Sequence, residues 1–301
     1  MLFTFQGVIP AIWTPTDSEG QLLKEDLRAN LDFLLGAGVE SLLVLGSTGE
    51  FVHLSVAQRK EVLETTIEHA KGTPVLVNIS HTNPRVVLEL GWHARAAGAV
   101  AVTCLPPWFF PMSDADLIEF FAYIGQNVGL PLALYNFAAL TGKRLTPEIV
   151  RGVASRTGLI GLKHSAGEMQ EHKPLVEVGR EFNFNVVTGW DTHIPEAMGL
   201  GAKGCISGLA NLVPELVLKV YQLVAAGRLD EARVPAGQMR RIGEVIDQIE
   251  FPHNVAAAME ARGLHVGKPK TIVSTQTNAR YAKVREQIRG LLDEFGLPCV
   301  R

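Results

Sequence analysis

The feature of this sequence that most limits its fold is a regular alternation of short apolar segments with longer amphipathic ones. The apolar segments are too short for helices and too apolar for exposed loops, so each is expected to be a buried strand. The expected strands cover residues 7–14, 41–45, 74–79, 100–105, 131–136, 159–163, 184–188 and 202–207. Between them, apolar residues recur at helical spacing and the connections are short. This order predicts parallel strands joined by helical crossovers.

Eight such strand-and-helix units over this length fit a closed (β/α)8 TIM barrel better than an open sheet. The units do not repeat in sequence, which disfavours a solenoid. Several expected helices begin at typical capping residues, which are Ser55, Asn83 with Pro84, Ser113, and Thr146 with Pro147. The expected helices cover residues 24–35, 55–70, 113–126 and 214–226, with others from 84, from 147, and from 168 to about 179.

The pattern changes after about residue 227. Residues 229–249, 255–261 and 279–295 are expected to be helices with no strand between them. We therefore expect the barrel to span residues 1–227 and a helical extension, packed on the barrel, to span residues 228–301. The linker near residue 268 is short, which disfavours an independent domain.

The composition excludes several classes of protein. The 301 residues are 47% hydrophobic and 20% charged, with a formal net charge of −3 and both signs interspersed, so no nucleic-acid partner is expected. No stretch approaches the roughly 20 apolar residues of a membrane span, and the first residues do not resemble a signal peptide. Cys104, Cys205 and Cys299 are widely spaced, so they predict neither a disulfide framework nor a zinc site. We expect a cytoplasmic protein.

One expected strand ends in a charged residue. The run from Gly158 to Leu162 is apolar, and Lys163 follows it. A buried amine is costly unless it has a partner or a task, and burial lowers its pKa, which makes it a nucleophile toward carbonyl carbon. The alternative is a lysine whose head extends to solvent from the end of the strand. Lys163 alone favours this alternative, because lysines with a strongly perturbed pKa are rare.

Other polar residues also follow the expected strands. In a barrel of this kind, chemistry is located at the carboxyl ends of the strands. The residues that the sequence places at this rim are Ser47, Thr48, His81, Trp108, Tyr135, Lys163, Asp191 and Ser207. Lys163 therefore shares one rim with a phenol and with a pair of hydroxyl groups.

The hydroxyl pair lies between two glycines, in the segment Gly46-Ser47-Thr48-Gly49. Such a turn can direct backbone N–H groups and hydroxyls at a carboxylate, or it can be an ordinary turn with capping hydroxyls. Tyr135 can likewise be a core residue, or it can move protons beside an imine-forming lysine. His81, His164 and His193 lie on different loops without paired carboxylates, so no metal site is expected.

These motifs together resemble the dihydrodipicolinate synthase/N-acetylneuraminate lyase family. The resemblance rests on the segments 46–50, 135–136, 161–163 and 201–207, and it covers essentially the whole chain. It implies a (β/α)8 barrel with a C-terminal helical extension, assembled as a homotetramer (a dimer of dimers) or a homodimer. It also implies a Schiff base between a lysine and a 2-oxo acid, commonly pyruvate, with no separate cofactor.

The resemblance also implies roles for individual residues. Lys163 is expected to form the imine, and Tyr135 to relay protons. Ser47 and Thr48 are expected to bind the carboxylate of the 2-oxo acid or to assist proton transfer, so Thr48 belongs to both the catalytic and the binding set. The other expected substrate-binding residues are Gly46, Ser165, Gly189, Asp191 and Ile206, with the carbonyl of Ile206 near the lysine.

Departures from the family pattern narrow the expected substrate. Synthases of this family carry an arginine where this chain has Leu140, and a tyrosine borrowed from the neighbouring subunit where it has Phe109. Asp191 matches an aspartate of the sialic acid lyases, but Thr192 and Gly208 replace their glutamate and serine. Ala138 replaces a proline that is usual in the family, with no consequence that the sequence reveals.

We therefore expect a class I aldolase that cleaves or forms a 2-keto-3-deoxy sugar acid through a pyruvate enamine. The alternatives are dihydrodipicolinate synthase, a keto-deoxy acid dehydratase that uses the same imine, and N-acetylneuraminate lyase. A catalytically silent regulator with the same fold is the alternative from another class. The presence of Lys163, Tyr135, Ser47 and Thr48 together disfavours it.

Overall fold

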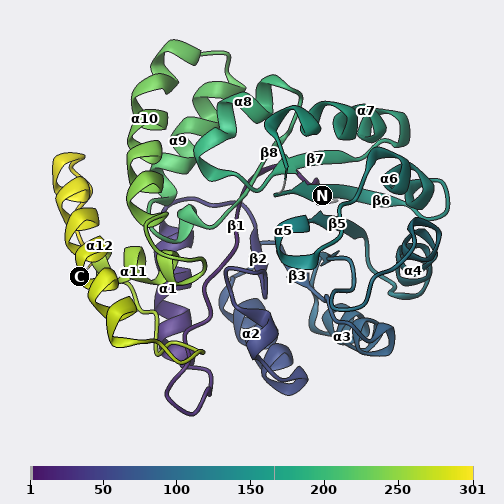
Figure 1. The fold of residues 1–301 in the computed structure, drawn as a ribbon, viewed down its shortest axis with the longest axis horizontal. Helices are drawn as coiled ribbons and strands as arrows, with labels where there is room; N and C mark the ends of the chain where they lie inside the picture. Colours follow the sequence, from purple (N-terminus) through teal and green to yellow (C-terminus); the bar gives the residue numbers. More distant parts are fainter. Residues whose placement is uncertain (1–2, 166, 301) are drawn as a thin grey trace.

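The computed structural model describes residues 3–165 and 167–300. Within these residues, parallel strands form the centre of the molecule and helices surround them (Figure 1). The strands are β1 (Gly7–Pro10), β2 (Leu42–Val44), β3 (Val75–Asn78), β4 (Ala101–Cys104), β5 (Leu132–Asn136), β6 (Leu159–His164), β7 (Asn185–Thr188) and β8 (Gly204–Ser207). Strand β6 extends one residue beyond its predicted segment, to His164, and the other strands are shorter than the apolar segments that predict them.

The sheet closes into a barrel. Its strands are hydrogen-bonded in the order β1-β8-β7-β6-β5-β4-β3-β2, all in parallel. A bridge between Ala11 and Leu43 joins the chain after β1 to β2, and the N–H of Ile12 donates to the carbonyl of Leu43 at 2.9 Å. The (β/α)8 barrel expected from the sequence is therefore confirmed.

The helices follow the expected alternation. They are α1 (Lys24–Gly36), α2 (Val56–His69), α3 (Pro84–Ala97), α4 (Asp114–Asn127), α5 (Ala138–Thr141), α6 (Pro147–Ala154), α7 (His172–Phe182), α8 (Ile194–Gly199), α9 (Pro214–Ala225), α10 (Leu229–Ile246), α11 (His253–Arg262) and α12 (Thr275–Glu294). The side chains of Ser55, Asn83, Ser113 and Thr146 each accept a hydrogen bond from a backbone N–H in the first turn that follows. These four predicted helix starts are correct.

Four helices differ from the prediction. Helix α7 continues past Gly179, where a Cβ would lie 2.6 Å from the carbonyl oxygen of Phe184, so this glycine permits close packing and does not end the helix. Helix α12 begins earlier than expected because Ser274 caps it, accepting from the N–H of Thr277. Helix α10 ends three residues before residue 249, and the expected 255–261 helix extends over His253–Arg262. Helices α5 and α8 are too short to show helical periodicity.

The interior of the barrel holds a small core that places the site. One residue from each of seven strands contributes to it: Ile9, Leu43, Leu76, Ala101, Ala133, Val187 and Ile206. On β6 the corresponding position is Gly161, where a Cβ would lie 2.0 Å from the ring of Phe5, so the phenylalanine fills the space that the glycine leaves. Side chains alternate along a strand, so Tyr135 and Lys163, two residues further on, also point into the barrel.

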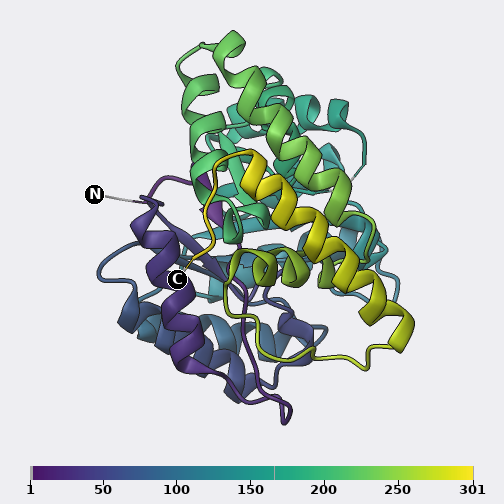
Figure 2. The ribbon, with the colours of Figure 1, turned by 90° about the vertical axis from the view of Figure 1, so that its left-hand side faces the viewer.

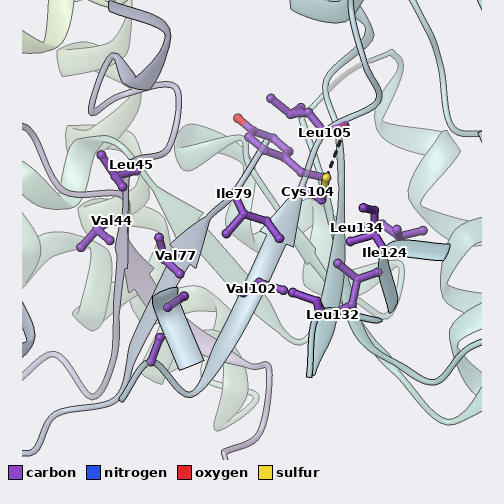
Figure 3. Packing of buried hydrophobic residues seen from close by; sticks show 14 of the residues in the cluster. Val44, Leu45, Val77, Ile79, Val102, Cys104, Leu105, Ile124, Leu132 and Leu134 are labelled. Atoms are coloured by element: carbon purple, nitrogen blue, oxygen red, sulfur yellow. Dashed lines mark hydrogen bonds between the residues drawn. The ribbon is translucent and has the colours of Figure 1, made fainter. Parts of the chain in front are cut away.

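A second core lies between the strands and the surrounding helices. Figure 3 shows outward-facing residues of three strands, Val77, Val102 and Leu134, in a cluster with Ile124 of α4. This alternation of inward and outward side chains makes both faces of each strand apolar. It explains why the strands are continuous apolar runs in the sequence.

The last three helices, α10–α12, form a layer on one side of the barrel (Figure 2). Helix α12 crosses this side over α11, and both pack with α9 and α10 in a separate apolar core. The indole N–H of Trp13, just after β1, donates to the carbonyl of Val266 at 2.9 Å and ties this layer to the barrel. Among the described helices, none combines the length and the apolar composition that crossing a membrane requires.

Candidate active site

The site is centred on two neighbouring strands. Tyr135 and Lys163 pair in register on β5 and β6, and both side chains are almost completely buried. The amine Nζ of Lys163 donates to the phenol oxygen of Tyr135 at 3.1 Å and lies 4.2 Å from the centre of its ring. A phenol in this position can move a proton to or from a group that is bonded to Nζ. The strand ladder fixes the pair, since the two backbones are hydrogen-bonded to each other.

The hydroxyl turn Gly46–Gly49 adds a third group. The Ser47 hydroxyl lies 3.3 Å from the phenol oxygen of Tyr135, within hydrogen-bonding distance. The residues on either side of the turn, Leu45 and Glu50, both have left-handed backbone conformations, with φ of 58° and 53°. Ser47, Tyr135 and Lys163 therefore form one continuous chain of polar contacts across the barrel.

A cavity of about 590 Å³ opens above this chain. Seven of the residues expected at the site line it, namely Thr48, Tyr135, Lys163, Ser165, Gly189, Asp191 and Ile206. Ser47 lines an adjoining cavity of about 170 Å³, whereas Gly46 is buried and lines neither cavity. The structure thus brings the expected residues together around Lys163, with Gly46 contributing only to the turn.

Gly189 is required by close packing. A Cβ there would lie 1.7 Å from the Ser165 hydroxyl and 2.9 Å from Cε of Lys163. Any larger residue would displace the lysine side chain. The Ser165 hydroxyl is buried and has no hydrogen-bond partner within the described part of the chain, so it remains free to contact a molecule in the cavity.

Asp191 supplies a carboxylate to the cavity. It begins the short turn η3 (Asp191–His193) after β7, and its Oδ2 accepts from the N–H groups of Gly208 and Leu209, each at 3.3 Å. Its Oδ1 is buried without a hydrogen-bond partner among residues 3–165 and 167–300. Burial raises the pKa of Asp191, against the lowering effects of the Ser207 hydroxyl, the two amides and the positive charge of Lys163. An unpaired carboxylate oxygen at this place is a ready acceptor for a substrate hydroxyl.

Thr192 and Gly208, which the resemblance places where sialic acid lyases carry a glutamate and a serine, also line the cavity. Several other lining residues were not expected from the sequence. They are Phe137, Trp190, His193, Leu209, and, from the extension, Gly243, Ile246, Asp247, Phe251, Asn254 and Val255. Among them, Asp247 places a second carboxyl group on the cavity wall, and burial raises its pKa. No strand end precedes the extension residues, so the rule that locates sites at strand ends could not identify them. The close approach of Gly243 to Thr192 is the contact that brings α10 over the cavity.

The wall of the adjoining cavity is largely apolar, and Leu140 forms part of it. Leu140 lies on α5 and is 51% exposed. The two cations that follow it in sequence are paired elsewhere: Lys143 with Asp114 at 2.6 Å and Arg144 with Glu171 at 2.7 Å. Lys163 is thus the only cationic side chain other than histidine among the described residues that line either cavity.

The remaining rim residues have other positions. His81 accepts a hydrogen bond from the N–H of Asn83, and the Ser207 hydroxyl accepts from the N–H of Ala210, so both stabilise turns. Trp108 lines the adjoining cavity, packed edge-to-face on Phe51. Within the described ranges, no three His, Cys, Asp or Glu side chains are grouped as metal ligands.

Phe109 is the residue that the resemblance places where synthases carry a tyrosine. It is 84% exposed, with φ of 86°, and its ring packs edge-to-face on Phe110 at 4.9 Å. Neither ring lines the cavity that contains Lys163. Within this chain, therefore, the loop after β4 supplies no group to Lys163.

Two buried histidines lie on the outer side of the same strand pair. His164 Nδ1 lies 3.1 Å from the side-chain nitrogen of Asn136, and the rings of His164 and His172 pack edge-to-face at 4.7 Å. Burial, reinforced by His172 and Arg144, lowers the pKa of His164 to about 3. Burial also lowers the pKa of His172. Both are therefore neutral imidazoles near neutral pH.

Comparison with known proteins gives consistent matches over most of the chain. Residues 4–290 match the model of the Dihydrodipicolinate synthetase family. The chain is 35% identical to "Putative 2-dehydro-3-deoxy-D-gluconate aldolase YagE" of Escherichia coli K12 over 76% of this chain and 77% of the relative. It is 30% identical to the 4-hydroxy-tetrahydrodipicolinate synthase of Methanospirillum hungatei over 93% and 98%. The crystal structure of YagE in complex with pyruvate matches with a TM-score of 0.88 at 30% identity, over 95% of this chain and 98% of that one.

Proposed function

We infer the reaction of this protein from the premise that the chain belongs to the dihydrodipicolinate synthetase family. It is an enzyme, a carbon–carbon lyase of the class I aldolase type that works through a Schiff base. Both the aldolase-named and the synthase-named relatives match it. Our proposal concerns the residues that carry the reaction and the substrate on which they act.

We propose that Lys163 is the residue that forms the imine. Its neutral amine attacks C2 of a 2-oxo acid, and water leaves to give a protonated imine. The imine withdraws electrons from C3. When the C3–C4 bond breaks, the C4 hydroxyl loses its proton and becomes an aldehyde, and the electron pair is held as an enamine. Protonation of C3 and addition of water then release pyruvate and regenerate the amine.

The groups around Lys163 fit the other steps. Tyr135, 3.1 Å from Nζ, is proposed to take the proton of the C4 hydroxyl and to move protons during imine formation. Ser47 and Thr48 are proposed to hold the substrate carboxylate with their hydroxyls and the N–H groups of their turn. Ser165, Gly189 and the carbonyl of Ile206 complete the walls beside the imine.

The substrate that fits best is a 2-keto-3-deoxy sugar acid, and the observation that supports it is the charge of the cavity walls. Beyond Lys163 they carry carboxyl groups, Asp191 and Asp247, and the cations near Leu140 are paired elsewhere. Carboxylates accept hydrogen bonds from sugar hydroxyls, whereas they repel the carboxylate of aspartate semialdehyde. Dihydrodipicolinate synthase remains the alternative because the synthase match covers almost the whole chain.

We also propose a cytoplasmic homotetramer or homodimer. The buried free thiols of Cys104 and Cys205 fit a reducing compartment. The exposed rings of Phe109 and Phe110 provide apolar surface of the kind that subunit interfaces cover. Analytical ultracentrifugation measures the assembly directly, and a monomer at micromolar concentration would contradict this part of the proposal.

A side-by-side assay tests the proposed substrate. The purified protein is given 2-keto-3-deoxygluconate in one reaction and pyruvate with aspartate semialdehyde in the other. We expect cleavage of the sugar acid to pyruvate and glyceraldehyde, with slow or no condensation. Loss of water from the sugar acid without formation of pyruvate would identify a dehydratase. Efficient condensation with no cleavage of any keto-deoxy acid would identify the synthase.

A further inference from the structure

A buried ion pair links the C-terminal extension to the turn beside the active site. Lys270 lies between α11 and α12, and its Nζ is 2.8 Å from Oε2 of Glu50, with side chains only 3% and 2% exposed. The same amine donates to the carbonyl of Thr14 at 2.7 Å and lies 4.9 Å from the ring of Trp13. These contacts hold the amine in one position between the barrel and the extension.

Glu50 directly follows the hydroxyl turn, which carries Ser47 and Thr48. Its backbone N–H donates to the carbonyl of Ser47 at 3.1 Å, and its own backbone is left-handed, with φ of 53°. Such a conformation is unfavourable for a residue with a side chain, so surrounding contacts must maintain it. The ion pair to Lys270 is the contact that fixes the Glu50 side chain.

The rest of the turn has no freedom to compensate. A Cβ on Gly49 would lie 3.0 Å from the carbonyl oxygen of Ile12 and 3.0 Å from the hydroxyl of Thr14, so the turn is packed tightly against the chain after β1. A shift of Glu50 therefore also shifts Ser47. Since the Ser47 hydroxyl lies 3.3 Å from the phenol of Tyr135, the displacement extends to the residues around the amine of Lys163.

The pair is not needed to attach the extension. Three other hydrogen bonds attach the same segment to the barrel. The indole N–H of Trp13 donates to the carbonyl of Val266, and the side-chain amide of Asn30 donates to the carbonyl of His265 at 2.6 Å. The backbone N–H of Lys268 donates to the carbonyl of Thr16, also at 2.6 Å. Buried ion pairs rarely stabilise a fold more than well-packed apolar residues of the same size. The position of this pair, at the end of the hydroxyl turn, thus points to a role other than holding the fold together.

We propose that Lys270 is a positioning residue that acts through Glu50 to hold the Ser47–Thr48 turn in the conformation that receives the substrate carboxylate. The inference rests on the proposed role of that turn. It assigns to the extension a part in binding the 2-oxo acid, although Lys270 itself is remote from the reacting atoms. Loss of the pair is expected to weaken binding of the 2-oxo acid, with little effect on the stability of the fold.

The test compares variants of the full-length protein in borohydride trapping with pyruvate. The main variant is the double substitution Glu50→Gln with Lys270→Met, which removes both charges and leaves neither buried alone. Lys270→Met is measured with it, and Lys268→Met is the matched control, because Lys268 lies two residues away and is exposed. Circular dichroism defines a temperature at which each variant is folded, and the pyruvate concentration for half-maximal trapping is measured there.

We expect the double variant to need roughly tenfold to hundredfold more pyruvate, as small displacements at reacting groups produce effects of that size. Its melting temperature should stay within a few degrees of the wild-type value, and Lys268→Met should match wild type in both measurements. An unchanged half-saturation in the double variant overturns the inference, even if its melting temperature falls. If the wild-type protein itself traps no pyruvate, the proposed Schiff base is wrong, and the role of Lys270 that rests on it fails too. An unchanged half-saturation in the double variant, with normal trapping by the wild type, overturns only the role of Lys270.

Discussion

The two ends of the cavity are built in different ways. The reacting end, with Tyr135 and Lys163, belongs to two adjacent strands whose backbones pair residue by residue. The far end is assembled from η3, the turn after β8, and the extension, which contributes Asp247 and Asn254. Strand pairing fixes the reacting groups, whereas the far end depends on how separate segments pack. Chemistry and choice of substrate can therefore change independently in this fold.

The strongest test of this division is Lys163→Ala. Without the amine no imine forms, so cleavage of the sugar acid should fall at least about 10⁴-fold, given that enzymes commonly accelerate reactions by 10⁶-fold or more. Steady-state assays with 2-keto-3-deoxygluconate measure the loss. Near-normal turnover by this variant would remove Lys163 from the mechanism.

Tyr135→Phe tests the second member of the reacting end. The ring stays in the core while the hydroxyl is lost, so the fold should be retained and kcat should fall on the order of 10²–10⁴-fold. A kcat within a few-fold of wild type would leave Tyr135 as a packing residue only. Thermal unfolding serves as the control for an effect on folding.

Asp191→Asn tests the far end by itself. The substitution keeps the size and removes the charge, and a hydrogen bond to a charged group contributes about 1.5–3 kcal/mol, so kcat/KM for the sugar acid should fall roughly 10- to 100-fold. Trapping of pyruvate, which lacks the hydroxyl groups that Asp191 is proposed to bind, should be reduced much less. Equal losses with both ligands would show that the two ends are not separable.

The dependence of the free energy of unfolding on pH tests the two histidines, His164 and His172, that are buried in the neutral form on the outer side of β5 and β6. Because the pKa of His164 is lowered to about 3, the unfolded state, with a pKa near 6.5, takes up a proton first as the pH falls below 6.5. The free energy of unfolding should therefore decrease from about pH 6.5 toward pH 3, by up to about 1.4 kcal/mol per pH unit for this group.

Urea unfolding at several pH values measures this slope. His164→Asn should flatten it, while His53→Gln, which replaces an exposed histidine, should leave it unchanged. Identical slopes in wild type and His164→Asn would show that His164 is not a neutral buried group. A stability that rises on acidification would contradict the direction of the lowered pKa.

The sequence predicts the reacting end better than the far end for a physical reason. A buried strand is recognised by its own apolar residues, and Tyr135 and Lys163 stand at the ends of such runs. Such apolar runs also predicted the eight strands of the barrel, and capping residues, which are local features too, predicted four helix starts. Helix α5, which carries Leu140, has only four residues and therefore no periodicity to detect.

Contacts between distant parts of the chain could not be predicted in this way. Glu50 and Lys270 are 220 positions apart, and nothing near either residue in the sequence indicates that they pair. Asp247 follows α10, which packs on η3, and Asn254 lies on α11, which packs on the turn Leu209–Asn211 after β8. A glycine such as Gly179 was also misinterpreted, because the atom that approaches it belongs to a residue beyond the helix.

The central claim is that Lys163 forms an imine with a 2-oxo acid, and one measurement tests it most directly. The protein is incubated with pyruvate and borohydride, digested, and analysed by mass spectrometry, with Lys163→Ala in parallel. We predict a single pyruvate-derived adduct on the peptide that contains Lys163, and no adduct in the variant. An unmodified wild-type protein, or an undiminished adduct in Lys163→Ala, would contradict the account.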